Sequence, residues 1–369
     1  MRIGIVSDTH FGYTRFYKDS ITQGREAIIK AIEKSDVLIH AGDMFDSRLP
    51  SFETLKQVLD IWKEAFTFKK PIIAIHGNHE RRIKGYTNPV NLISTTGMIK
   101  YLHGEVVSIE KGEERINILG IGSVPEEHSK LIIEKSIENN REMLKEGKNI
   151  LVIHQMIKEF DPTESTELSL SYLESLDFEV IIDGHLHKRH LNDSSKLIVA
   201  GSTVVTSLDE SEIAHNRGFV VYDTKTRKKE FFEIKQRKIL SKTLEFKNAG
   251  YEEISLAIEK EYNQMKLNNE NAIIRIKITG KIREGLIPSL IHIPKYPDLY
   301  VKNNINGSLK DELEAAKKYF NYENVNKWAD EEIKRKLRGK TKVNEEKLLS
   351  ILYETDDLER GMELLLNEE

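Results

Sequence analysis

RIGIVSDTH, residues 2–10, joins a short apolar run to two side chains that can bind a metal, Asp8 and His10. Seven further apolar, β-branched runs follow, with helical patterns between several of them. The eight runs are RIGIVSD (2–8), VLIHAGD (37–43), PIIAIHGN (71–78), INILGIGS (116–123), ILVIHQ (150–155), EVIIDGH (179–185), LIVAGS (197–202) and GFVVYDT (218–224). Continuous apolar runs are typical of strands buried on both faces, so the sequence predicts an α/β fold over the first 235 residues.

In five of these runs, a residue that can bind a metal lies just beyond the last apolar residue. The five residues are Asp8, Asp43, Asn78, His154 and His185. In layered α/β folds, ligand sites form outside the carboxyl ends of the strands. We therefore expect the five side chains to meet at one site, together with the neighbouring imidazoles of His10, His79 and His187. A lone histidine is usually structural, so the prediction depends on the set and on its order along the chain.

The composition limits the chemistry of this site. The 369 residues include no cysteine, so disulfides and thiolate metal ligands are excluded, and any metal must be bound by oxygen and imidazole nitrogen. The formal net charge of −4 is unlike that of a protein that binds nucleic acid over its whole surface. The absence of cysteine predicts a cytoplasmic protein. No apolar run approaches the ~20 residues that are needed to span a bilayer, so we expect no membrane segment.

The ligand motifs, taken in order, resemble those of the calcineurin-like metallophosphoesterases over roughly residues 1–235. The motifs are Asp8-x-His10, Gly42-Asp43-x-x-Asp46, Gly77-Asn78-His79-Glu80, His154 and Gly184-His185-x-His187. Within that superfamily the chain is similar to the SbcD-type nucleases of double-strand-break repair. This closer likeness depends on Phe45-Asp46, Pro50-Ser51 and Gly201-Ser202-Thr203.

The resemblance implies a domain layout. A four-layer α-β-β-α sandwich, the nuclease domain, would cover residues 1–235, and a small α+β capping domain would cover residues 236–306. Residues 251–262 have a helical pattern and residues 272–280 alternate as a strand, which fits such a unit. Residues 307–369 would form a linker and a C-terminal helical tail that binds a coiled-coil ABC-type ATPase.

The resemblance also implies two Mn²⁺ ions per subunit. One ion would be bound by Asp8, His10, Asp43 and His187, and the other by Asp43, Asn78, His154 and His185. His79 would be catalytic rather than a ligand, orienting the phosphate or protonating the leaving oxygen. Asp46 is a departure, because many members of the nuclease family have histidine there, and that histidine is associated with exonuclease activity. We expect Asp46 to orient a ligand from outside the coordination sphere.

Basic residues stand beside three of the ligand loops. They are Arg15 and Lys18, then Arg81, Arg82 and Lys84, then Lys188 and Arg189. A solvated surface would explain them in so charged a chain. A groove that contacts the phosphates of DNA explains their position better, because neutralising the DNA backbone dominates affinity.

Other segments predict partner contacts. Residues 53–66 carry an apolar stripe at helical spacing, which is usually core. The resemblance implies that helices near 53–66 and 88–98 pair across a two-fold axis, so we also expect a homodimer. The implied DNA-repair role would associate the cytoplasmic protein with the nucleoid.

Three functions compete. The first is a manganese-dependent DNA nuclease, a 3′–5′ exonuclease on duplex ends and an endonuclease on single strands or hairpins. The second is a phosphatase or small-molecule phosphodiesterase using the same site; protein phosphatases share Gly-Asn-His-Glu but have arginine where this chain has Ser47. The third is a binding scaffold without chemistry, which would be expected to lack ligands.

Overall fold

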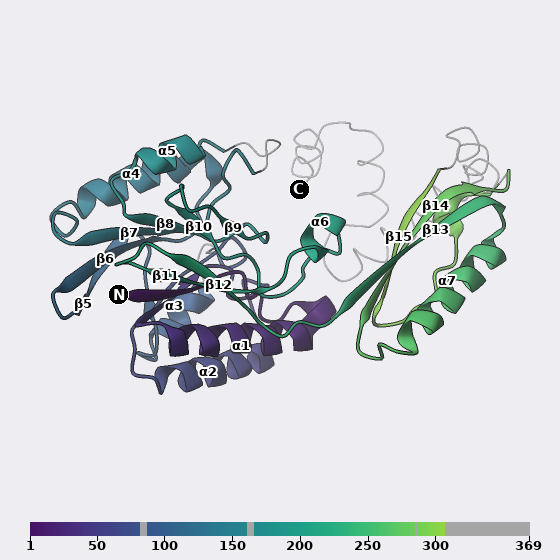
Figure 1. Ribbon diagram of the computed structural model, residues 1–369, viewed down its shortest axis with the longest axis horizontal. Helices are drawn as coiled ribbons and strands as arrows, with labels where there is room; N and C mark the ends of the chain where they lie inside the picture. The colour runs from purple at the N-terminus through teal and green to yellow at the C-terminus, as the bar shows by residue number, and fades with distance from the viewer. Residues whose placement is uncertain (82–86, 161–165, 285, 307–369) are drawn as a thin grey trace, which may run out of the picture. The chain divides into compact units, whose positions relative to one another are not determined.

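The computed structural model describes residues 1–81, 87–160, 166–284 and 286–306. Its contacts divide the chain into two compact units, Met1–Lys238 and the part that begins at Ile239 (Figure 1). The expected helical tail at 307–369, and with it the ATPase-binding region, lies outside the described residues. None of the helices in the described ranges combines the length and apolar character needed to cross a lipid bilayer.

The first unit contains two six-stranded sheets. In the first sheet, the order is β12-β11-β1-β2-β3-β4. Its strands are β1 (Arg2–Val6), β2 (Val37–Ala41), β3 (Ile72–Ile75), β4 (Lys100–Tyr101), β11 (Gly218–Asp223) and β12 (Lys229–Glu233). Strands β1 to β4 run parallel, whereas β11 pairs antiparallel with β1, placing Arg2 opposite Asp223.

The second sheet has the order β5-β6-β7-β8-β10-β9. Its strands are β5 (Glu105–Lys111), β6 (Glu114–Ile121), β7 (Lys148–Ile153), β8 (Val180–Asp183), β9 (His190–Leu191) and β10 (Leu197–Val199). Strands β6, β7, β8 and β10 run parallel, and the edge strands β5 and β9 are antiparallel to their neighbours.

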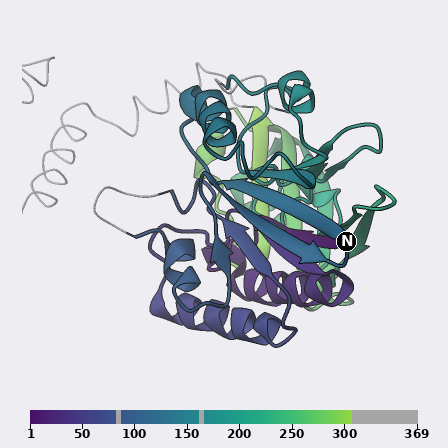
Figure 2. The same cartoon turned by 90° about the vertical axis from the view of Figure 1, so that its left-hand side faces the viewer.

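Helices cover the outer faces of both sheets. They are α1 (Tyr17–Lys34), α2 (Phe52–Phe66), α3 (Pro89–Ser94), α4 (Ser129–Asn139) and α5 (Leu170–Ser175). The short helix α6 (Glu210–Ile213) and the 3-10 turns η1 (Thr14–Phe16) and η2 (Glu126–His128) lie in connecting segments. Helices α1 and α2 lie on one side of the sheets, and α4 and α5 lie on the other (Figures 1 and 2).

The period-two alternation of the strands builds three apolar layers. In β1, Ile3 and Ile5 face the second sheet, while Val6 packs against the helices α1 and α2. In β7, Ile150 and Val152 face the first sheet, and the intervening residues of that strand pack beneath α4 and α5. The predicted four-layer α-β-β-α sandwich is therefore confirmed.

Helix α2 uses its apolar stripe largely as core. Val58 and Trp62 are fully buried against the first sheet, as the sequence pattern indicates. Phe66 belongs to the same stripe, but half of its surface is exposed, and Phe52 at the start of the helix is 90% exposed. The helix thus keeps exposed apolar side chains at both of its ends.

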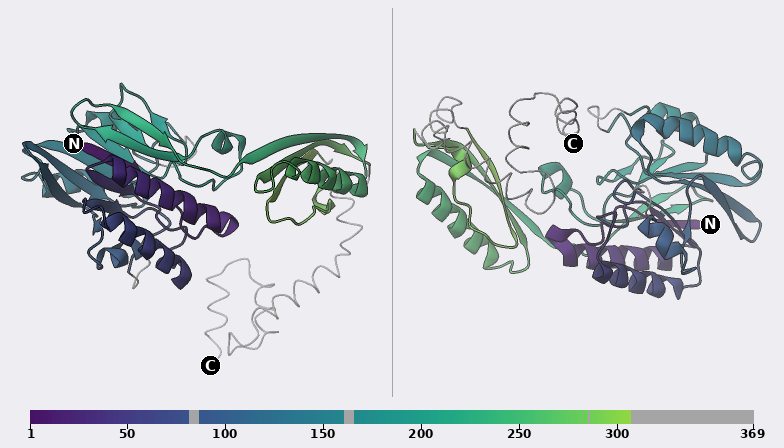
Figure 3. Two further views of the ribbon diagram at one scale, coloured as in Figure 1. Left: turned by 60° about the horizontal axis from the view of Figure 1, so that its bottom comes forward. Right: turned by 180° about the vertical axis from the view of Figure 1, so that it is seen from behind.

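The described part of the second unit is a three-stranded parallel sheet with one helix. Its elements are β13 (Ile239–Ala249), α7 (Tyr251–Lys266), β14 (Ile273–Ile282), η3 (Pro288–Leu290) and β15 (Leu299–Asn306). Figure 3 shows α7 along one face of these strands, where Ile254 and Ile258 pack on Ile274 and Ile276. An α+β unit was predicted here, but only α7 and β14 could be recognised from the sequence.

Candidate metal centre

The carboxyl ends of strands from both sheets supply the polar residues. Asp8 and His10 follow β1, Asp43 follows β2, and Asn78 and His79 follow β3. From the second sheet, His154 follows β7, and His185 and His187 follow β8. The structure brings all eight residues together through the contacts described below. Two sheets, rather than one, therefore build the candidate site.

Unusual backbone conformations turn these loops inward. Asp8, His10, Asp43 and His185 all have positive φ angles, of 50°, 42°, 49° and 66°. Such conformations are disfavoured for residues with a side chain and tend to persist at functional sites, where surrounding structure enforces them. The strain is thus concentrated where side chains must converge.

Glycines make room for the convergence. Gly42 has φ of +89°, and a Cβ there would lie 2.4 Å from His154 Nδ1. A Cβ at Gly77 would lie 2.0 Å from Asp43 Oδ1, and one at Gly184 would lie 2.0 Å from the carbonyl oxygen of Ala41. Contacts this short do not occur, so the site depends on these three glycines.

One donor cluster consists of Asp8, His10 and His187, whose ligand atoms lie within 4.8 Å of one another. The Nε2 atoms of the two imidazoles are 3.1 Å apart. The backbone N–H of His185 donates to Asp8 Oδ1, while Asp8 Oδ2 is buried without a hydrogen-bond partner. Burial raises the pKa of Asp8 above its usual value. A buried carboxylate oxygen without a partner needs a positive charge nearby.

A second donor cluster consists of Asp43, His154 and His185. Asn78 Oδ1 joins it, lying 3.1 Å from His154 Nε2 and 2.8 Å from His185 Nδ1. The other ring nitrogen of His154, Nδ1, lies 2.8 Å from the carbonyl oxygen of Ala41. A hydrogen bond to that carbonyl holds a proton on Nδ1, so Nε2 is the nitrogen that can lose its proton and bind a metal, as in metal-binding histidines.

Asp43 connects the two clusters. Its Oδ2 atom lies 3.9 Å from His10 Nε2 and 3.3 Å from His154 Nε2, and its Oδ1 atom accepts a hydrogen bond from the His79 backbone at 3.0 Å. Burial lowers the pKa of His154, but the nearby Asp43 carboxylate outweighs it and raises the value to about 10. The clusters therefore share one carboxylate, and their oxygen and imidazole donors fit divalent cations.

His79 and Asp46 lie at the edge of the first cluster. His79 Nδ1 is 2.9 Å from the carbonyl oxygen of Asp46, and its side chain is 38% exposed. The Asp46 carboxylate lies 3.4 Å from His10 Nδ1 and 3.8 Å from His79 Nδ1. Asp46 thus contacts two site histidines, and ligand atoms of His10, Asp46 and His79 lie within 4.8 Å of one another as a third group of potential metal donors.

A buried chain of polar residues supports His187, and sequence reasoning missed it. His187 Nδ1 lies 2.6 Å from Thr206 Oγ1, and the backbone N–H of Thr206 donates to Glu212 Oε1 at 2.8 Å. Arg217, 1% exposed, pairs with Glu212 at 3.2 Å and donates to the carbonyl oxygen of His187 at 3.0 Å. No spacing rule links these residues, although an arginine directly before the apolar run 218–222 is a weak signal.

Glu80 ties two ligand loops together. Its carboxylate accepts hydrogen bonds from the backbone N–H groups of Phe45, at 2.6 Å, and Gly77, at 2.7 Å. Burial, together with the Asp43 charge, raises the pKa of Glu80 to about 8. The last residue of the Gly-Asn-His-Glu motif therefore holds the Asp43 loop against the Asn78 loop.

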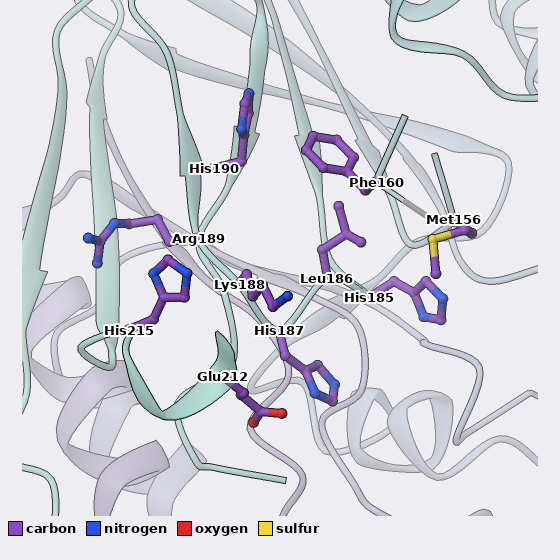
Figure 4. A pocket seen from close by; sticks show the side chains of 10 residues that line it. All are labelled: Met156, Phe160, His185, Leu186, His187, Lys188, Arg189, His190, Glu212 and His215. Atoms are coloured by element: carbon purple, nitrogen blue, oxygen red, sulfur yellow. The ribbon is translucent and has the colours of Figure 1, made fainter. Parts of the chain in front are cut away.

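The predicted basic residues fall into different environments. Lys188 and Arg189 follow His187 directly and line the same cavity as His185 and His187 (Figure 4). Arg81 lines a second cavity, beside His76 and Tyr101. Arg15 in η1 and Lys18 at the start of α1 are exposed, whereas Arg82 and Lys84 lie outside the described residues.

Residues 1–189 match the calcineurin-like phosphoesterase family, and the chain belongs to that family. Three archaeal relatives, each named DNA double-strand break repair protein Mre11, are similar to it. The Saccharolobus solfataricus protein is 31% identical over 56% of this chain and 55% of its own length. The Methanosarcina acetivorans protein is 26% identical over 83% of this chain and 51% of its own length. The Methanocaldococcus jannaschii protein is 26% identical over 77% of each chain.

The chain therefore spans about half the length of the first two of these relatives. Family membership and the donor set together assign a metal-dependent phosphoesterase site to the first unit. They do not identify the substrate of this chain, because the name of each relative states the function of that relative.

Proposed function

We propose that the chain is a divalent-metal-dependent DNA nuclease that processes double-strand breaks. The observation that carries the proposal is the position of Asp43 between two donor clusters, 3.9 Å from His10 Nε2 and 3.3 Å from His154 Nε2. A shared carboxylate between two sets of donors is what two-metal hydrolysis of phosphate esters requires. Similarity to proteins named for double-strand-break repair favours DNA as the substrate.

The cofactor in this proposal is a pair of Mn²⁺ ions, which suit oxygen and imidazole donors. Asp8, His10, Asp43 and His187 would bind one ion, and Asp43, Asn78, His154 and His185 would bind the other. When bound, such ions neutralise the phosphate and activate water for attack on phosphorus. The chain itself supplies the fixed directions of the donors, through Ala41, Thr206 and the three glycines.

His79 is the group that we assign to proton transfer. The contact between its Nδ1 atom and the Asp46 carbonyl holds the ring in one orientation and leaves Nε2 for substrate. From that position His79 would orient the phosphate and give a proton to the leaving oxygen. Asp46, 3.4 Å from His10 Nδ1, would orient both His10 and His79, in place of the histidine that many related nucleases have.

The finer features of the proposal concern substrate and partners. The activity would be 3′–5′ exonucleolytic on duplex ends and endonucleolytic on single strands or hairpins. DNA would contact Arg15, Lys18, Arg81, Lys188 and Arg189, with Arg82 and Lys84 outside the described residues. The unit beginning near residue 236 would act as a cap on a catalytic domain of residues 1–235.

The exposed apolar side chains at both ends of α2, together with Leu92 on α3, which is 49% exposed, support a homodimer through α2 and α3. Residues 307–369 would bind a coiled-coil ABC-type ATPase. The complex would work in the cytoplasm, associated with the nucleoid.

The test is degradation of 3′-end-labelled duplex DNA by the purified chain, with Mn²⁺, with Mg²⁺ or with a chelator. Asp8→Asn removes one donor charge, and Asp177→Asn changes an exposed aspartate between α5 and β8 as the matched control. We expect manganese-dependent release of mononucleotides by the parent chain and by the Asp177 variant, and none by the Asp8 variant.

Hydrolysis of simple aryl phosphodiesters without any DNA cleavage would contradict the proposal. It would favour the second candidate, a phosphatase or small-molecule phosphodiesterase that uses the same site. Equal DNA cleavage by the Asp8 variant would instead locate the activity elsewhere or in a contaminant.

A further inference from the structure

The second sheet of the first unit ends in a long edge strand, β5 (Glu105–Lys111), which has seven residues. The edge strands β4 and β9 have two residues each. Figure 1 shows β5 at the outer margin of the unit. Within the described parts of the chain, no strand pairs with the outer side of β5. Its outward backbone N–H and C=O groups can therefore pair with a further strand.

The centre of β5 lacks the features that usually protect a sheet edge from pairing. Such protection comes from charged side chains, proline or a β-bulge. Residues 106–109 are apolar or neutral, and β5 pairs with β6 from Glu105 to Lys111 without a shift of register. Val107 and Ile109 pack against the layer between the two sheets, and Val106 packs against the layer beneath α4 and α5. The edge is therefore regular and apolar at its centre.

The two ends of β5 carry opposite charges. Glu105 begins the strand and Lys111 ends it, and both are exposed. The Lys111 ammonium lies 2.7 Å from Asp36 Oδ1, but its side chain is 63% exposed, so it can donate to a second acceptor as well. In an antiparallel pair the start of one strand lies opposite the end of the other. A second copy of β5 would therefore bring its Glu105 to Lys111 and its Lys111 to Glu105.

The strand is complementary to itself about Ser108. With Ser108 opposite Ser108 of a second copy, Val107 lies opposite Ile109 and Glu105 lies opposite Lys111. Apolar pairs and pairs of opposite charge stabilise antiparallel strands, and no like charges are opposed in this register. Centring the pair on Ile109 would instead place Glu105 opposite Glu113. The charges and the apolar residues thus favour the same register.

We infer that the β5 strands of two copies pair antiparallel about a two-fold axis at Ser108, which joins their second sheets into one continuous sheet. The partner is a second copy of this chain, because charge and apolar pattern are both complementary within one strand. Helices α2 and α3 pack on the first sheet, so the β5 surface is separate from the proposed helical interface. A chain that uses both surfaces links dimers into larger assemblies.

The experiment uses cross-linking of the full chain. Because the chain has no cysteine, a single introduced cysteine reports on one position. Opposed residues of an antiparallel pair have Cα atoms about 4.5–5.5 Å apart, and disulfides join Cα atoms about 4.4–6.8 Å apart. Ser108→Cys should therefore form a disulfide-linked dimer under mild oxidation. A non-reducing denaturing gel detects this dimer whether or not α2 and α3 also pair.

Glu110→Cys is the matched control for register. Glu110 lies on the same face of the same strand and is more exposed than Ser108. In the inferred register it lies opposite Val106, so the two introduced cysteines would be roughly 13 Å apart at about 3.3 Å per residue. We expect this variant to cross-link at least about tenfold more slowly than Ser108→Cys.

Charge exchange in the Ser108→Cys background tests the contacts at the two ends. Glu105→Lys opposes two lysines, and Lys111→Glu opposes two glutamates. Each change should slow cross-linking about tenfold, because the two-fold axis repeats it at both ends of the pair. The double variant exchanges the charges and should restore the rate, although it retains the loss of the Lys111–Asp36 contact within the chain. Asp177→Lys, at an exposed aspartate between α5 and β8, is the control and should leave the rate unchanged.

Equal rates for the Ser108 and Glu110 cysteine variants would overturn the inference, because random collision would then explain the cross-link. Absence of a cross-link in Ser108→Cys would also overturn it and would leave the edge to an extended segment of another protein. A double charge variant that stays as slow as the single variants would overturn the assigned register. The inference goes beyond the proposed function, and none of these results bears on metal-dependent cleavage of DNA.

Discussion

The Nε2 atoms of His10 and His187 face each other across 3.1 Å, although the two residues are 177 positions apart in the chain. His10 Nδ1 faces the Asp46 carboxylate, and His187 Nδ1 lies beside Thr206 Oγ1. Each imidazole is therefore held from behind, and its remaining nitrogen points into the same small volume. Holding these groups together without a cation costs free energy.

Adding Mn²⁺ to metal-free protein should raise its stability. A cation that binds only the folded state adds about 2.7 kcal/mol when its concentration is 100 times its dissociation constant. We expect Asp8→Asn to lose most of this gain and yet to be at least as stable as the parent without metal, because the uncompensated Asp8 charge is gone. Thermal unfolding with and without Mn²⁺ measures both effects, and an unchanged metal response in the variant would contradict the ligand assignment.

Thr206 should raise the affinity for metal although it is not a metal ligand. Thr206→Val removes the hydroxyl that contacts His187 Nδ1, and loss of such supporting contacts typically weakens metal binding by about 10–100-fold. Thr206→Ser keeps the hydroxyl and should restore most of the affinity. Titration calorimetry with Mn²⁺ distinguishes the two; equal affinities would show that the contact has no role in binding.

Gly42 and Gly97 form a matched pair, since both have positive φ. At Gly97 a Cβ would meet nothing within 4 Å, so Gly97→Ala should cost about 1 kcal/mol of stability and leave metal binding intact. At Gly42 the Cβ would lie 2.4 Å from His154 Nδ1, so Gly42→Ala should weaken Mn²⁺ binding at least 100-fold. A Gly42 variant that binds Mn²⁺ as tightly as the Gly97 variant would show that the loop can relax.

Glu80→Ala should destabilise the first unit. It leaves the buried N–H groups of Phe45 and Gly77 without an acceptor, at about 1–3 kcal/mol each. Glu80→Gln retains one acceptor oxygen and should cost about half as much. Urea unfolding measures the difference; Glu33→Ala, at an exposed glutamate of α1, should stay within about 0.5 kcal/mol of the parent.

His76 should make the fold sensitive to mild acid. Burial and the neighbouring His103 lower the pKa of His76 from 6.5 to about 3. Between these values the unfolded chain binds a proton that the folded chain does not. The contribution of His76 is therefore complete above pH 6.5 and is lost as pH falls towards 3, by up to about 1.4 kcal/mol per pH unit.

The measurement is urea unfolding of metal-free protein at several pH values from 7 to 4. His76→Asn should reduce the slope of stability against pH, and His128→Asn, at an exposed histidine, should leave it unchanged. The same slope in the His76 variant and the parent would assign the acid sensitivity to another group.

Much of the fold of the first unit could be predicted, because its apolar runs correspond to strands that are buried in the folded unit. Apolar runs that are buried on both faces stop where the chain leaves the sheet, so Asp43 and His154 could be placed at strand ends from their neighbours alone. The support of His187 by Thr206, Glu212 and Arg217 could not be predicted. Such contacts depend on loop geometry, which no periodicity encodes.

The second unit was predicted less completely for a related reason. In β13 the sequence ILSKTLEFKNA alternates weakly, because Lys242 shares the α7-facing side with Leu240 and Leu244 and pairs with Glu261 of α7 at 3.8 Å, and the burial of the strand is mixed. β15 follows a segment with three prolines and contains several asparagines, which are poor strand formers. Pairing with β14 on both sides, rather than local propensity, makes these segments strands.

Strand β1, which leads into Asp8 and His10, lies between β2 and β11 and pairs with both. Strand β1 can therefore pair with β11 only after Asp223, the last residue of β11, has been synthesised. At about 5–20 residues per second, that delay is roughly 10–45 seconds of synthesis. Until then β1 can pair with β2 alone, and we expect the loop that carries Asp8 and His10 to be held less firmly than in the folded domain. The metal would then bind after the domain has folded. The geometry of the finished site, rather than the order in which ions are encountered during synthesis, would select the metal.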